Sequence, residues 1–398
     1  MRPHSFAIMA FAGTLTMFGP LSTDMQVPAL PAMVGDLNTT AARAQLSISL
    51  FMLGFGLGQL FVGPFADRFG RKPVLMGGMI LFALASVACL LAPTIEVLIA
   101  ARFVQAFGTA SAWVLSRTIV RDLHDAAGTT RMLSFVTVVM GSTSLYAPVL
   151  GGLLVEWPGW RAVFAIHVVV GIVVFLATWR FYTESVPVRL ADAARPVIIL
   201  RNSLFLMRDR VFRGYALTQA MMISAMGAFV SAGSFVFRDF GLAPSEFGLL
   251  FTAISGSFIV GSLLAGSLTR RIAPDRLYRW ALVLATASAL VMVSMAASPW
   301  ASVTSVIAPM MGVTFALGFI MPLSFAGALA AHPNLAGTAS SLMGFQQAML
   351  SSLVGVVAIA LYDGTAVPMT AIMTLLIVSA LTVYMILLFP RRSRPMSG

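Results

Sequence analysis

Cysteine and charge are both scarce in this sequence, and each shortage excludes a class of protein. The single cysteine, Cys89, lies inside an apolar run, so the chain has neither a disulfide framework nor a thiolate cluster for a metal. Only 10% of the residues are charged and 59% are hydrophobic, more than in an ordinary soluble domain. The composition therefore indicates a membrane protein surrounded by a lipid bilayer.

Several functional motifs are also missing. The phosphate-binding pattern G-x-x-x-x-G-K-[ST] is absent, so we expect no ATP site. A net charge of +11 would suggest nucleic acid in a soluble chain, but the arginines lie in short gaps between apolar runs, and we expect no such partner. There is no cluster of catalytic side chains and no sizeable soluble domain, which argues against an enzyme or a receptor. No cofactor, metal or catalytic residue is expected.

Twelve apolar runs are long enough to cross a bilayer as helices, which need about 20 mostly apolar residues each. The first run, 7–30, is too long for the core of a signal peptide and contains Asp24, so we expect a retained helix. The predicted fold class is an all-α polytopic membrane protein with both termini on one side. The runs begin near residues 7, 44, 74, 97, 132, 162, 212, 248, 280, 301, 337 and 367.

The distribution of arginines predicts which side holds the termini. Lys and Arg concentrate in the cytoplasmic loops of membrane proteins. With both termini inside, the outer segments contain only Arg43, Arg161 and Arg238, and nearly all other Lys and Arg residues lie in inner segments. We therefore expect both termini to be cytoplasmic.

The sequence carries traces of an internal duplication. The longest polar gap follows the sixth span, and many secondary transporters are built from such repeats. We expect an N-terminal six-helix bundle over 1–181, a cytoplasmic linker over 182–211 and a C-terminal six-helix bundle over 212–398. Aligning the halves pairs Phe55 with Phe258, Gly58 with Gly261, Leu60 with Leu263, Gly63 with Gly266 and Arg68 with Arg271.

A charged cluster, GPFADRFGRKP, interrupts the apolar runs between the second and third spans. Gly63 is expected to let two helix backbones approach closely, and Gly70 to supply the positive φ of a tight turn. Asp67 is expected to meet an arginine of a neighbouring loop, such as Arg121, or a helix N-terminus. The simpler interpretation is that the basic residues of this cluster only fix the orientation of the chain in the membrane.

The pattern G-x-x-x-D-R-x-G-R-K in this cluster resembles the loop signature of the major facilitator superfamily. The resemblance implies the major facilitator fold of two six-helix halves, with the loop as a latch that holds the halves closed on the cytoplasmic side. In the second half Arg270 stands in place of Asp67 and Pro274 in place of Arg71, so we expect a weaker or differently made latch there. The latch residues on this interpretation are Gly63, Asp67, Arg68, Gly70, Arg71, Lys72 and Arg121.

Three further stretches resemble motifs of the twelve-helix drug/proton antiporters of this superfamily. They are LSTDMQVPALP (21–31), RFVQAFGTASAWVLSRTIVRDL (102–123) and YAPVLGG (146–152). Ala106 and Ala147 replace glycines that are usual in these motifs, and both changes occur in the bicyclomycin and chloramphenicol resistance branch. The resemblance implies drug efflux across the inner membrane of a bacterium.

The last of these stretches, the antiporter motif, also has a physical interpretation. Pro148 removes a backbone donor and bends its helix, while Gly151 and Gly152 permit close packing against a neighbour. We expect this motif to seal the centre of the protein against proton leak. The alternative is the ordinary glycine and proline content of a membrane helix.

Two charged residues lie within the predicted spans. Asp24 is the only acidic residue clearly inside a span, and Arg102 is the only basic residue well inside one. An isolated charge there costs roughly 2.5 to 3.5 kcal/mol on insertion scales. Because both lie at a similar depth, we expect the two side chains to meet. We hypothesise that Asp24 exchanges a proton for substrate and that Arg102 tunes it; the alternative is a structural ion pair.

Two helical faces are candidate linings for the substrate. Methionine and aromatic surfaces accommodate varied apolar shapes, and a few amides and hydroxyls orient polar groups. Helix packing is the alternative for both faces. Gln346 and Gln347 are further candidates, and His167 is expected to be a packed or pore-edge residue. The lining residues are Gln105, Thr109, Trp113 and Ser116 on the fourth span and Tyr215, Gln219, Met222 and Met226 on the seventh.

Together these features predict a proton-coupled exporter that exchanges H⁺ for a small, largely apolar drug, such as a phenicol or bicyclomycin, by alternating access. The alternative is a transporter of the same fold that handles a metabolite, such as a sugar or nucleoside, because no substrate-specific motif is present. We expect a monomer whose partners are the drug, protons and the lipid bilayer.

Overall fold

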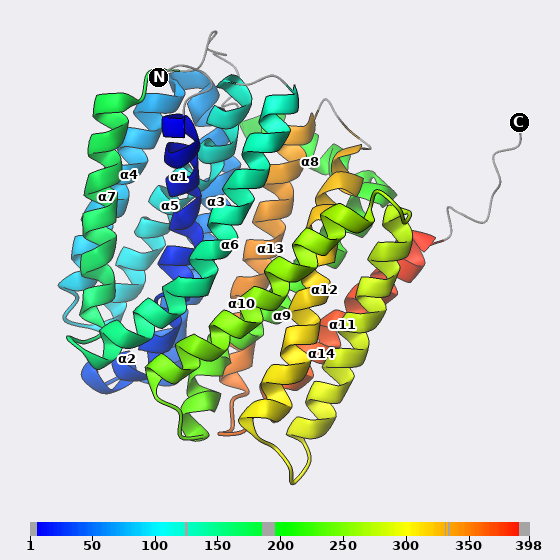
Figure 1. The fold of residues 1–398 in the computed structure, drawn as a ribbon. Coiled ribbons are helices and arrows are strands. Elements are labelled where there is room, and N and C mark those ends of the chain that lie inside the picture. Colours follow the sequence, from blue (N-terminus) through cyan, green and yellow to red (C-terminus); the bar gives the residue numbers. More distant parts are fainter. Residues whose placement is uncertain (1–5, 124–125, 185–195, 331, 333–334, 390–398) are drawn as a thin grey trace, which may run out of the picture. The chain divides into compact units, whose positions relative to one another are not determined.

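The computed structural model is helical, as Figure 1 shows, and it contains no strand among the residues that it describes. Eleven of the described helices are long and apolar enough to cross a membrane, and the 19-residue helix α1 occupies the first predicted span. The predicted all-α polytopic fold is confirmed. The described ranges are 6–123, 126–184, 196–330, 332 and 335–389.

Each predicted span corresponds to one long helix. Three short elements were not predicted: η1 (Val27–Ala29), α2 (Leu30–Asp36) and α8 (Pro196–Arg208), the last of which lies in the predicted linker. The long helices are α1 (Phe6–Asp24), α3 (Ala41–Phe69), α4 (Arg71–Leu90), α5 (Ile95–Leu123), α6 (Ala126–Glu156), α7 (Arg161–Phe181), α9 (Arg210–Asp239), α10 (Pro244–Leu268), α11 (Pro274–Ala296), α12 (Val303–Ala330), α13 (Ala336–Ala360) and α14 (Val367–Leu387).

The local sequence explains where several helices begin and end. Thr40 precedes α3, and its hydroxyl accepts a hydrogen bond from the Arg43 amide at 3.3 Å. Asp209 precedes α9, and its carboxylate accepts one from the Phe212 amide at 3.0 Å. Such side chains satisfy amides that have no partner within the helix. At the other end of α3, Gly70 has a φ of 104°, which glycine adopts without strain.

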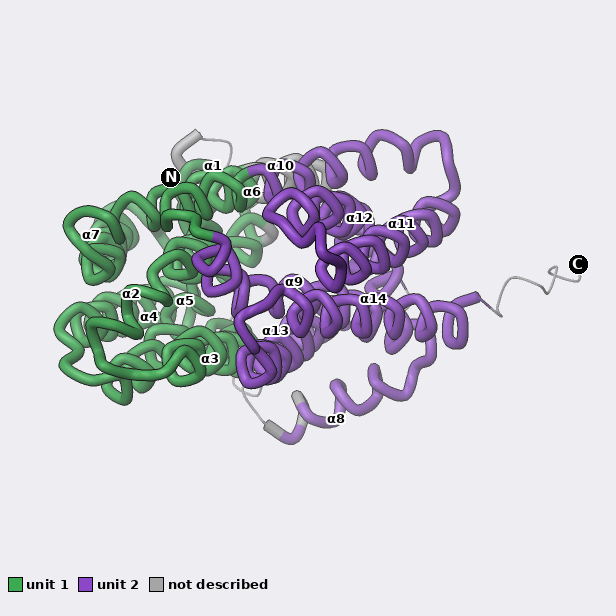
Figure 2. The backbone as a smooth tube through the Cα atoms, turned by 90° about the horizontal axis from the view of Figure 1, so that it is seen from below, with its two compact units in different colours: residues 1–196, 241–252 green, residues 197–240, 253–398 purple. Residues whose placement is uncertain are grey.

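The helices form two compact units, which Figure 2 colours separately. The first unit contains residues 1–196 and 241–252, and so includes α1 to α7 and the beginning of α10. The second contains residues 197–240 and 253–398, and so includes α8 from its second residue, α9, the rest of α10 and α11 to α14. The chain first passes from one unit to the other inside the predicted linker.

In the first unit, α5 packs against α1, α3 and α4. Small residues bring α3 and α5 together: a Cβ at Gly54 would lie 2.7 Å from the Phe103 carbonyl oxygen, and one at Gly58 would lie 2.6 Å from the Ala110 Cβ. Membrane helices associate closely where glycine or alanine lies at the crossing. The crossing fixes α5, which carries Arg102, against its neighbours.

The second unit has an equivalent crossing. Gly261 of α10 is the repeat counterpart of Gly58, and a Cβ there would meet the Phe315 carbonyl oxygen of α12. On the facing helix, a Cβ at Gly318 would lie 2.7 Å from the Ser262 amide nitrogen. Helices in equivalent places therefore cross at glycines in both units.

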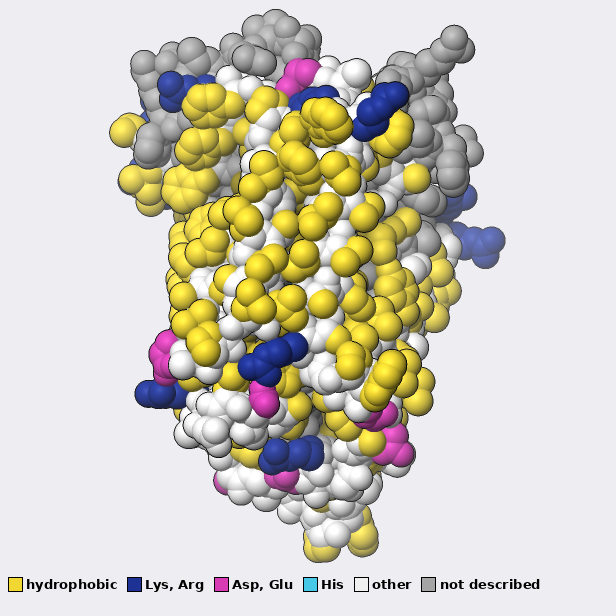
Figure 3. Space-filling model, turned by 90° about the vertical axis from the view of Figure 1, so that its left-hand side faces the viewer, with side chains coloured by type: hydrophobic (Ala, Val, Ile, Leu, Met, Phe, Trp, Pro, Cys, Tyr) yellow, Lys and Arg dark blue, Asp and Glu magenta, His cyan; other side chains and the backbone are white. Residues whose placement is uncertain are grey.

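The exposed side chains of the helices are apolar over much of their length. Leu84, Leu263 and Leu375, on three different helices, are each more than 60% exposed. On the face shown in Figure 3, hydrophobic side chains cover the middle, and Lys, Arg, Asp and Glu lie nearer the two ends. Water would disfavour such a surface and a bilayer favours it, as expected for a multi-pass membrane protein.

Candidate functional site

Asp24 is the last residue of α1, where the chain passes toward the short helix η1. Its side chain is partly buried, and one carboxylate oxygen accepts a hydrogen bond from Thr23 Oγ1 at 2.9 Å. The Ser144 side chain of α6 lies beside the same carboxylate. The partners of Asp24 are therefore neutral hydroxyls, so a proton can be gained or lost there without breaking an ion pair.

Arg102 of α5 is fully buried, with 0% of its surface exposed. Its Nη2 donates to the Ser22 carbonyl oxygen at 2.8 Å, and its Nη1 donates to Oε1 of Gln105. The guanidinium carbon lies 3.9 Å from the centroid of the Phe51 ring, which is a cation–π contact. Two neutral oxygens and an aromatic face thus hold the charge, and they come from α1, α5 and α3.

Asp24 and Arg102 form no ion pair within the part of the chain that the structure describes, so the expectation that they meet was wrong for this conformation. Arg102 does reach α1 near the expected depth, at Ser22. Each residue of a helix turns by about 100°, so residues two apart point about 200° apart. Ser22 faces α5, where its hydroxyl lies 3.4 Å from Thr109 Oγ1, whereas Asp24 faces Ser144 of α6.

Gln105 extends the polar network to two further helices. Its Nε2 donates to the Ser86 hydroxyl of α4 at 2.6 Å and lies 3.5 Å from Nδ1 of His167 on α7. The other ring nitrogen of His167 lies 3.2 Å from the Leu21 carbonyl oxygen of α1. Sequence reasoning missed Ser22 and Ser86, because serine is common in membrane helices and their spacing gave no signal.

Of the other residues on the predicted substrate-lining face of α5, two are buried and one is partly exposed. Thr109 and Ser116 are buried, and the Ser116 hydroxyl accepts a hydrogen bond from Thr16 of α1 at 2.9 Å. Trp113 is partly exposed, and the Arg117 guanidinium lies 4.5 Å from its ring centroid. The hydroxyls therefore hold α1 against α5, while Trp113 keeps surface that a ligand could contact.

The four predicted residues of α9 also differ in their surroundings. Met222 is fully buried, and Gln219 is buried with its Nε2 donating to Oε1 of Gln347 on α13 at 3.2 Å. Tyr215 and Met226 are partly exposed. Because α9 packs against α12, α13 and α14, residues spaced along one helical face do not all reach one open space.

Tyr215 lines a cavity of about 590 Å³ between α9, α10, α11 and α12 in the second unit. The rings of Tyr215 and Tyr278 meet edge to face at 5.4 Å in its wall, and the Tyr278 hydroxyl lies 2.8 Å from that of Ser324. The volume falls in the range of small-molecule sites. The sequence predicted Tyr215 but not the other walls, which come from distant parts of the chain.

Arg71 is the centre of the charged loop cluster in the first unit. Its Nη1 lies 2.5 Å from the Asp67 carboxylate, and its Nε lies 3.0 Å from Asp122 at the end of α5. Asp67 thus pairs with the first residue of α4. The expected partner of Asp67, Arg121, has a side chain outside the described part of the chain. Asp122, its neighbour, was missed.

Glu184 completes the cluster, and the sequence gave no indication of it. Its carboxylate accepts hydrogen bonds from the backbone amides of Arg71 at 2.9 Å and Lys72 at 3.2 Å. A carboxylate is stabilised at a helix N-terminus, here that of α4. The Lys72 ammonium in turn donates to the Trp179 carbonyl oxygen at 3.0 Å. The cluster therefore ties α3, α4, α5 and the segment after α7 together.

Two members of the predicted latch have a simpler environment. Arg68 is exposed, with its guanidinium 5.0 Å from the centroid of the Phe69 ring. Gly63 was expected at a close helix crossing, which is wrong: a Cβ there would have no atom within 4 Å. The crossing lies earlier in α3, at Gly54 and Gly58, because those glycines are on the side that faces α5.

The antiporter motif lies within α6, where both glycines are buried against backbone. A Cβ at Gly151 would meet the Met25 carbonyl oxygen, next to Asp24 in the chain. One at Gly152 would meet the backbone of Pro244 at the start of α10, in the same unit. Another contact follows at Pro148, whose carbonyl oxygen approaches Gly248. Gly151 and Gly152 therefore have room for a hydrogen atom but not for a methyl group.

A bundle of long apolar helices that encloses an arginine and a carboxyl group is typical of a secondary membrane transporter. The chain matches the model of the Major Facilitator Superfamily over residues 12–359 and belongs to this superfamily.

Two relatives cover nearly the whole chain. The chain is 32% identical over 370 residues to the "Uncharacterized MFS-type transporter YdgK" of Bacillus subtilis, covering 92% of both chains. It is 29% identical over 392 residues to a "Bicyclomycin resistance protein homolog" of Haemophilus influenzae, covering 96% of both. Among solved structures, a bacterial homolog of the human lysosomal transporter Spinster matches with a TM-score of 0.78 at 17% identity, over 99% of this chain and 100% of that one, which shows the shared fold.

Proposed function

We propose that the chain is a proton-coupled exporter of the bacterial inner membrane that exchanges H⁺ for a small, largely apolar drug by alternating access. The observation that carries this proposal is the carboxyl group of Asp24, which lies in a span with the hydroxyls of Thr23 and Ser144 beside it and no cation paired to it in the described residues. The relative from Haemophilus influenzae, named for bicyclomycin resistance, supports a drug as the substrate.

In this mechanism Asp24 gains and loses the transported proton. The ionised carboxylate is a charge within a poorly solvated bundle, and protonation removes that charge. Asp24 ends α1 and faces Ser144 of α6, so its charge alters the contact between these helices. A change of charge that favours one arrangement of α1 over another shifts the population of transport states.

Arg102 supplies a fixed positive charge to the same helix. It holds the Ser22 carbonyl oxygen, two residues before Asp24, and has no carboxylate paired to it among the described residues. Its field therefore acts on Asp24 without an ion pair. Met25, the next residue, packs against Gly151, which keeps α6 close to the proton site and water out of that contact.

The proton gradient is large enough for this task. One proton that enters down a potential of 100 mV releases about 2.3 kcal/mol. A 1:1 exchange with a neutral drug could sustain roughly a fiftyfold concentration gradient from the potential alone.

Asp24→Asn tests the proposal directly. In a drug-sensitive bacterial host, we expect the wild type to confer resistance to bicyclomycin or a phenicol, and either Asp24→Asn or an uncoupler to abolish it. Asp363→Asn is a matched control, because Asp363 is an exposed aspartate of the loop between α13 and α14. All variants must reach the membrane in equal amounts.

Two outcomes would contradict the proposal. If Asp24→Asn exported a drug against its gradient as well as the wild type, Asp24 would not be the coupling residue. If the well-expressed wild type conferred no resistance to any compound in a broad panel, the result would favour a metabolite transporter of the same fold.

A further inference from the structure

The two repeat-related loops balance their charge differently. In the first half, Arg71 is surrounded by the carboxylates of Asp67 and Asp122, and Glu184 binds its backbone amide. In the second half, Arg270 takes the place of Asp67. Helix α12, the counterpart of α5, contains no acidic residue at all. The loop between α10 and α11 therefore lacks counterparts of Asp67 and Asp122, and the acidic residue beside it is Asp275 of α11.

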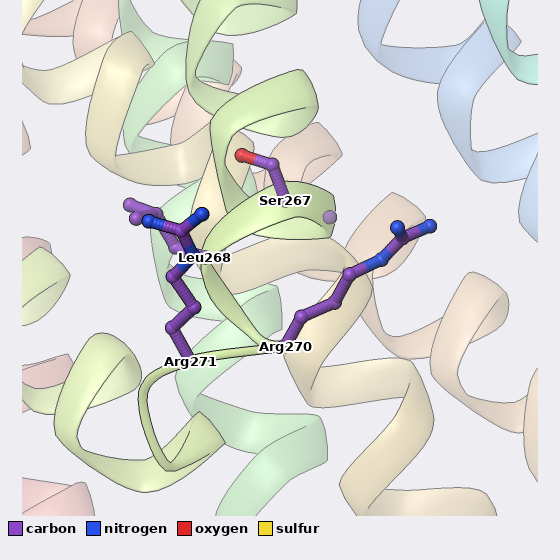
Figure 4. Close-up of a pocket in the computed structure, with 5 residues that line it drawn as sticks. Ser267, Leu268, Arg270 and Arg271 are labelled. Carbon is purple, nitrogen blue, oxygen red and sulfur yellow. The ribbon is translucent and has the colours of Figure 1, made fainter.

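The arginines in and beside this loop outnumber the one acidic residue next to it, Asp275 in the first turn of α11. Arg270, Arg271 and Arg276 are exposed. Arg270 and Arg271 line a pocket of about 570 Å³ at the end of α10. Figure 4 shows the two side chains extending on opposite sides of the last turn of α10, with the Ser267 hydroxyl between them in this view.

An apolar stripe along α10 leads to the pocket. Val260, Leu264 and Ser267 follow one another at i, i+4 and i+7, which is one helical face, and Arg271 lies in the turn after α10 ends at Leu268. Val260 is 51% exposed and Leu264 is 39% exposed, so this face is open to the surroundings of the protein. Beside the loop, Trp280 of α11 is 55% exposed, and tryptophan is enriched where the bilayer meets water.

We propose that the end of α10 binds the phosphate headgroup of an anionic phospholipid. Arginine matches the geometry of phosphate with two parallel hydrogen bonds, and Arg270 and Arg271 are both exposed at the pocket. The acyl chains lie along Val260 and Leu264 above the pocket. Free phosphate would gain nothing from this apolar face, which is why a lipid is the occupant. The predicted topology places the loop at the cytoplasmic leaflet, where anionic lipids attract basic residues.

Mass spectrometry of the intact, detergent-solubilised chain tests this site. Phosphatidylglycerol is titrated against wild type, Arg270→Gln/Arg271→Gln and the control Arg43→Gln/Arg238→Gln. The control removes the same charge, but Arg43 and Arg238 each pair with an acidic residue. We expect the double variant to bind the first phosphatidylglycerol at least about fivefold more weakly, since each basic residue near a lipid surface contributes about that factor.

Three results would overturn the proposal. They are equal binding of phosphatidylglycerol by the Arg270→Gln/Arg271→Gln variant and the wild type, an equal loss in the Arg43→Gln/Arg238→Gln control, and complete displacement of the lipid by excess inorganic phosphate. The last result would assign the pocket to a soluble anion. Titration with phosphatidylcholine should show no difference between the variants, and thermal unfolding verifies that each variant is folded.

Discussion

Arg102 keeps a positive charge inside the first unit with a carbonyl oxygen, an amide oxygen and an aromatic ring as its partners. Burying a charge without such partners costs several kcal/mol. The planar guanidinium suits this set, because it donates in two directions within its plane while its face rests on Phe51. Arginine therefore stabilises the contact of α5 with α1 and α3.

Arg102→Lys is expected to destabilise the protein. An ammonium cannot reproduce the two-direction hydrogen bonding or the contact with the Phe51 ring, and we expect a loss of about 2 kcal/mol in the free energy of unfolding. Thermal unfolding of the purified protein measures it. Arg43→Lys is the control, since Arg43 forms an exposed pair with Glu96 that should contribute little to stability. Equal unfolding midpoints for the two variants would contradict the prediction.

The environment of Asp36 predicts how the stability of the protein depends on pH. Hydrogen bonds from the Arg161 guanidinium and, at 3.0 Å, from the Trp160 indole lower the pKa of this aspartate. Its contribution to stability is therefore present above the unfolded pKa of about 3.9 and is lost as the pH falls through the lower folded value. Asp36→Asn should lower the free energy of unfolding at pH 7 by less than about 1 kcal/mol, because the group is exposed. The difference from wild type should shrink below about pH 4; a constant difference would contradict it.

Among the elements, α6 has little freedom to change where it carries the antiporter motif. Backbone atoms approach it there from two directions, from Met25 beyond α1 and from Pro244 at the start of α10. A bundle can leak protons where its helices separate, so tight contact on both sides of α6 is consistent with the proposed seal. The contact also joins α6 to the residue that follows Asp24.

Gly151→Ala is expected to separate α6 from Met25. The new methyl group would collide with a carbonyl oxygen that cannot move away as a side chain can, so we expect a loss of about 1 to 3 kcal/mol in stability. Gly77→Ala in α4 is the control, because a Cβ there meets no atom within 4 Å. Unfolding midpoints and proton leak into vesicles measure both effects. A variant as stable and as proton-tight as Gly77→Ala would exclude a sealing role for this contact.

The sequence predicted the elements better than it predicted their contacts. The long helices were found because a span must be apolar over about 20 residues, a signal that survives in any context. The short helices η1, α2 and α8 have no such signal. Hydropathy gives the depth of Asp24 and Arg102, but not the face on which each lies. Glu184 was missed because its partners, Arg71 and Lys72, are distant in the sequence.

For the whole molecule, the repeat explains both what the halves share and how they differ. Gly58 and Gly261 lie at equivalent helix crossings, which a duplicated fold must keep to remain packed. The charged loops are free of that constraint. In the first half, Asp67 and Asp122 of α5 pair with Arg71, while the second loop exposes Arg270 and Arg271. Close packing therefore requires glycine at both helix crossings, whereas the charges of the two loops can differ.

The lone cysteine, Cys89, is fully buried in α4, so a thiol reagent added to the native protein should find nothing to modify. The wild-type chain is therefore a ready background for site-directed chemical labelling. Ala273 and Ala297 are exposed residues at the two ends of α11. In intact cells, an impermeant maleimide should label Ala297→Cys but reach Ala273→Cys only after the membrane is opened. The reverse pattern would invert the orientation that the arginines predict.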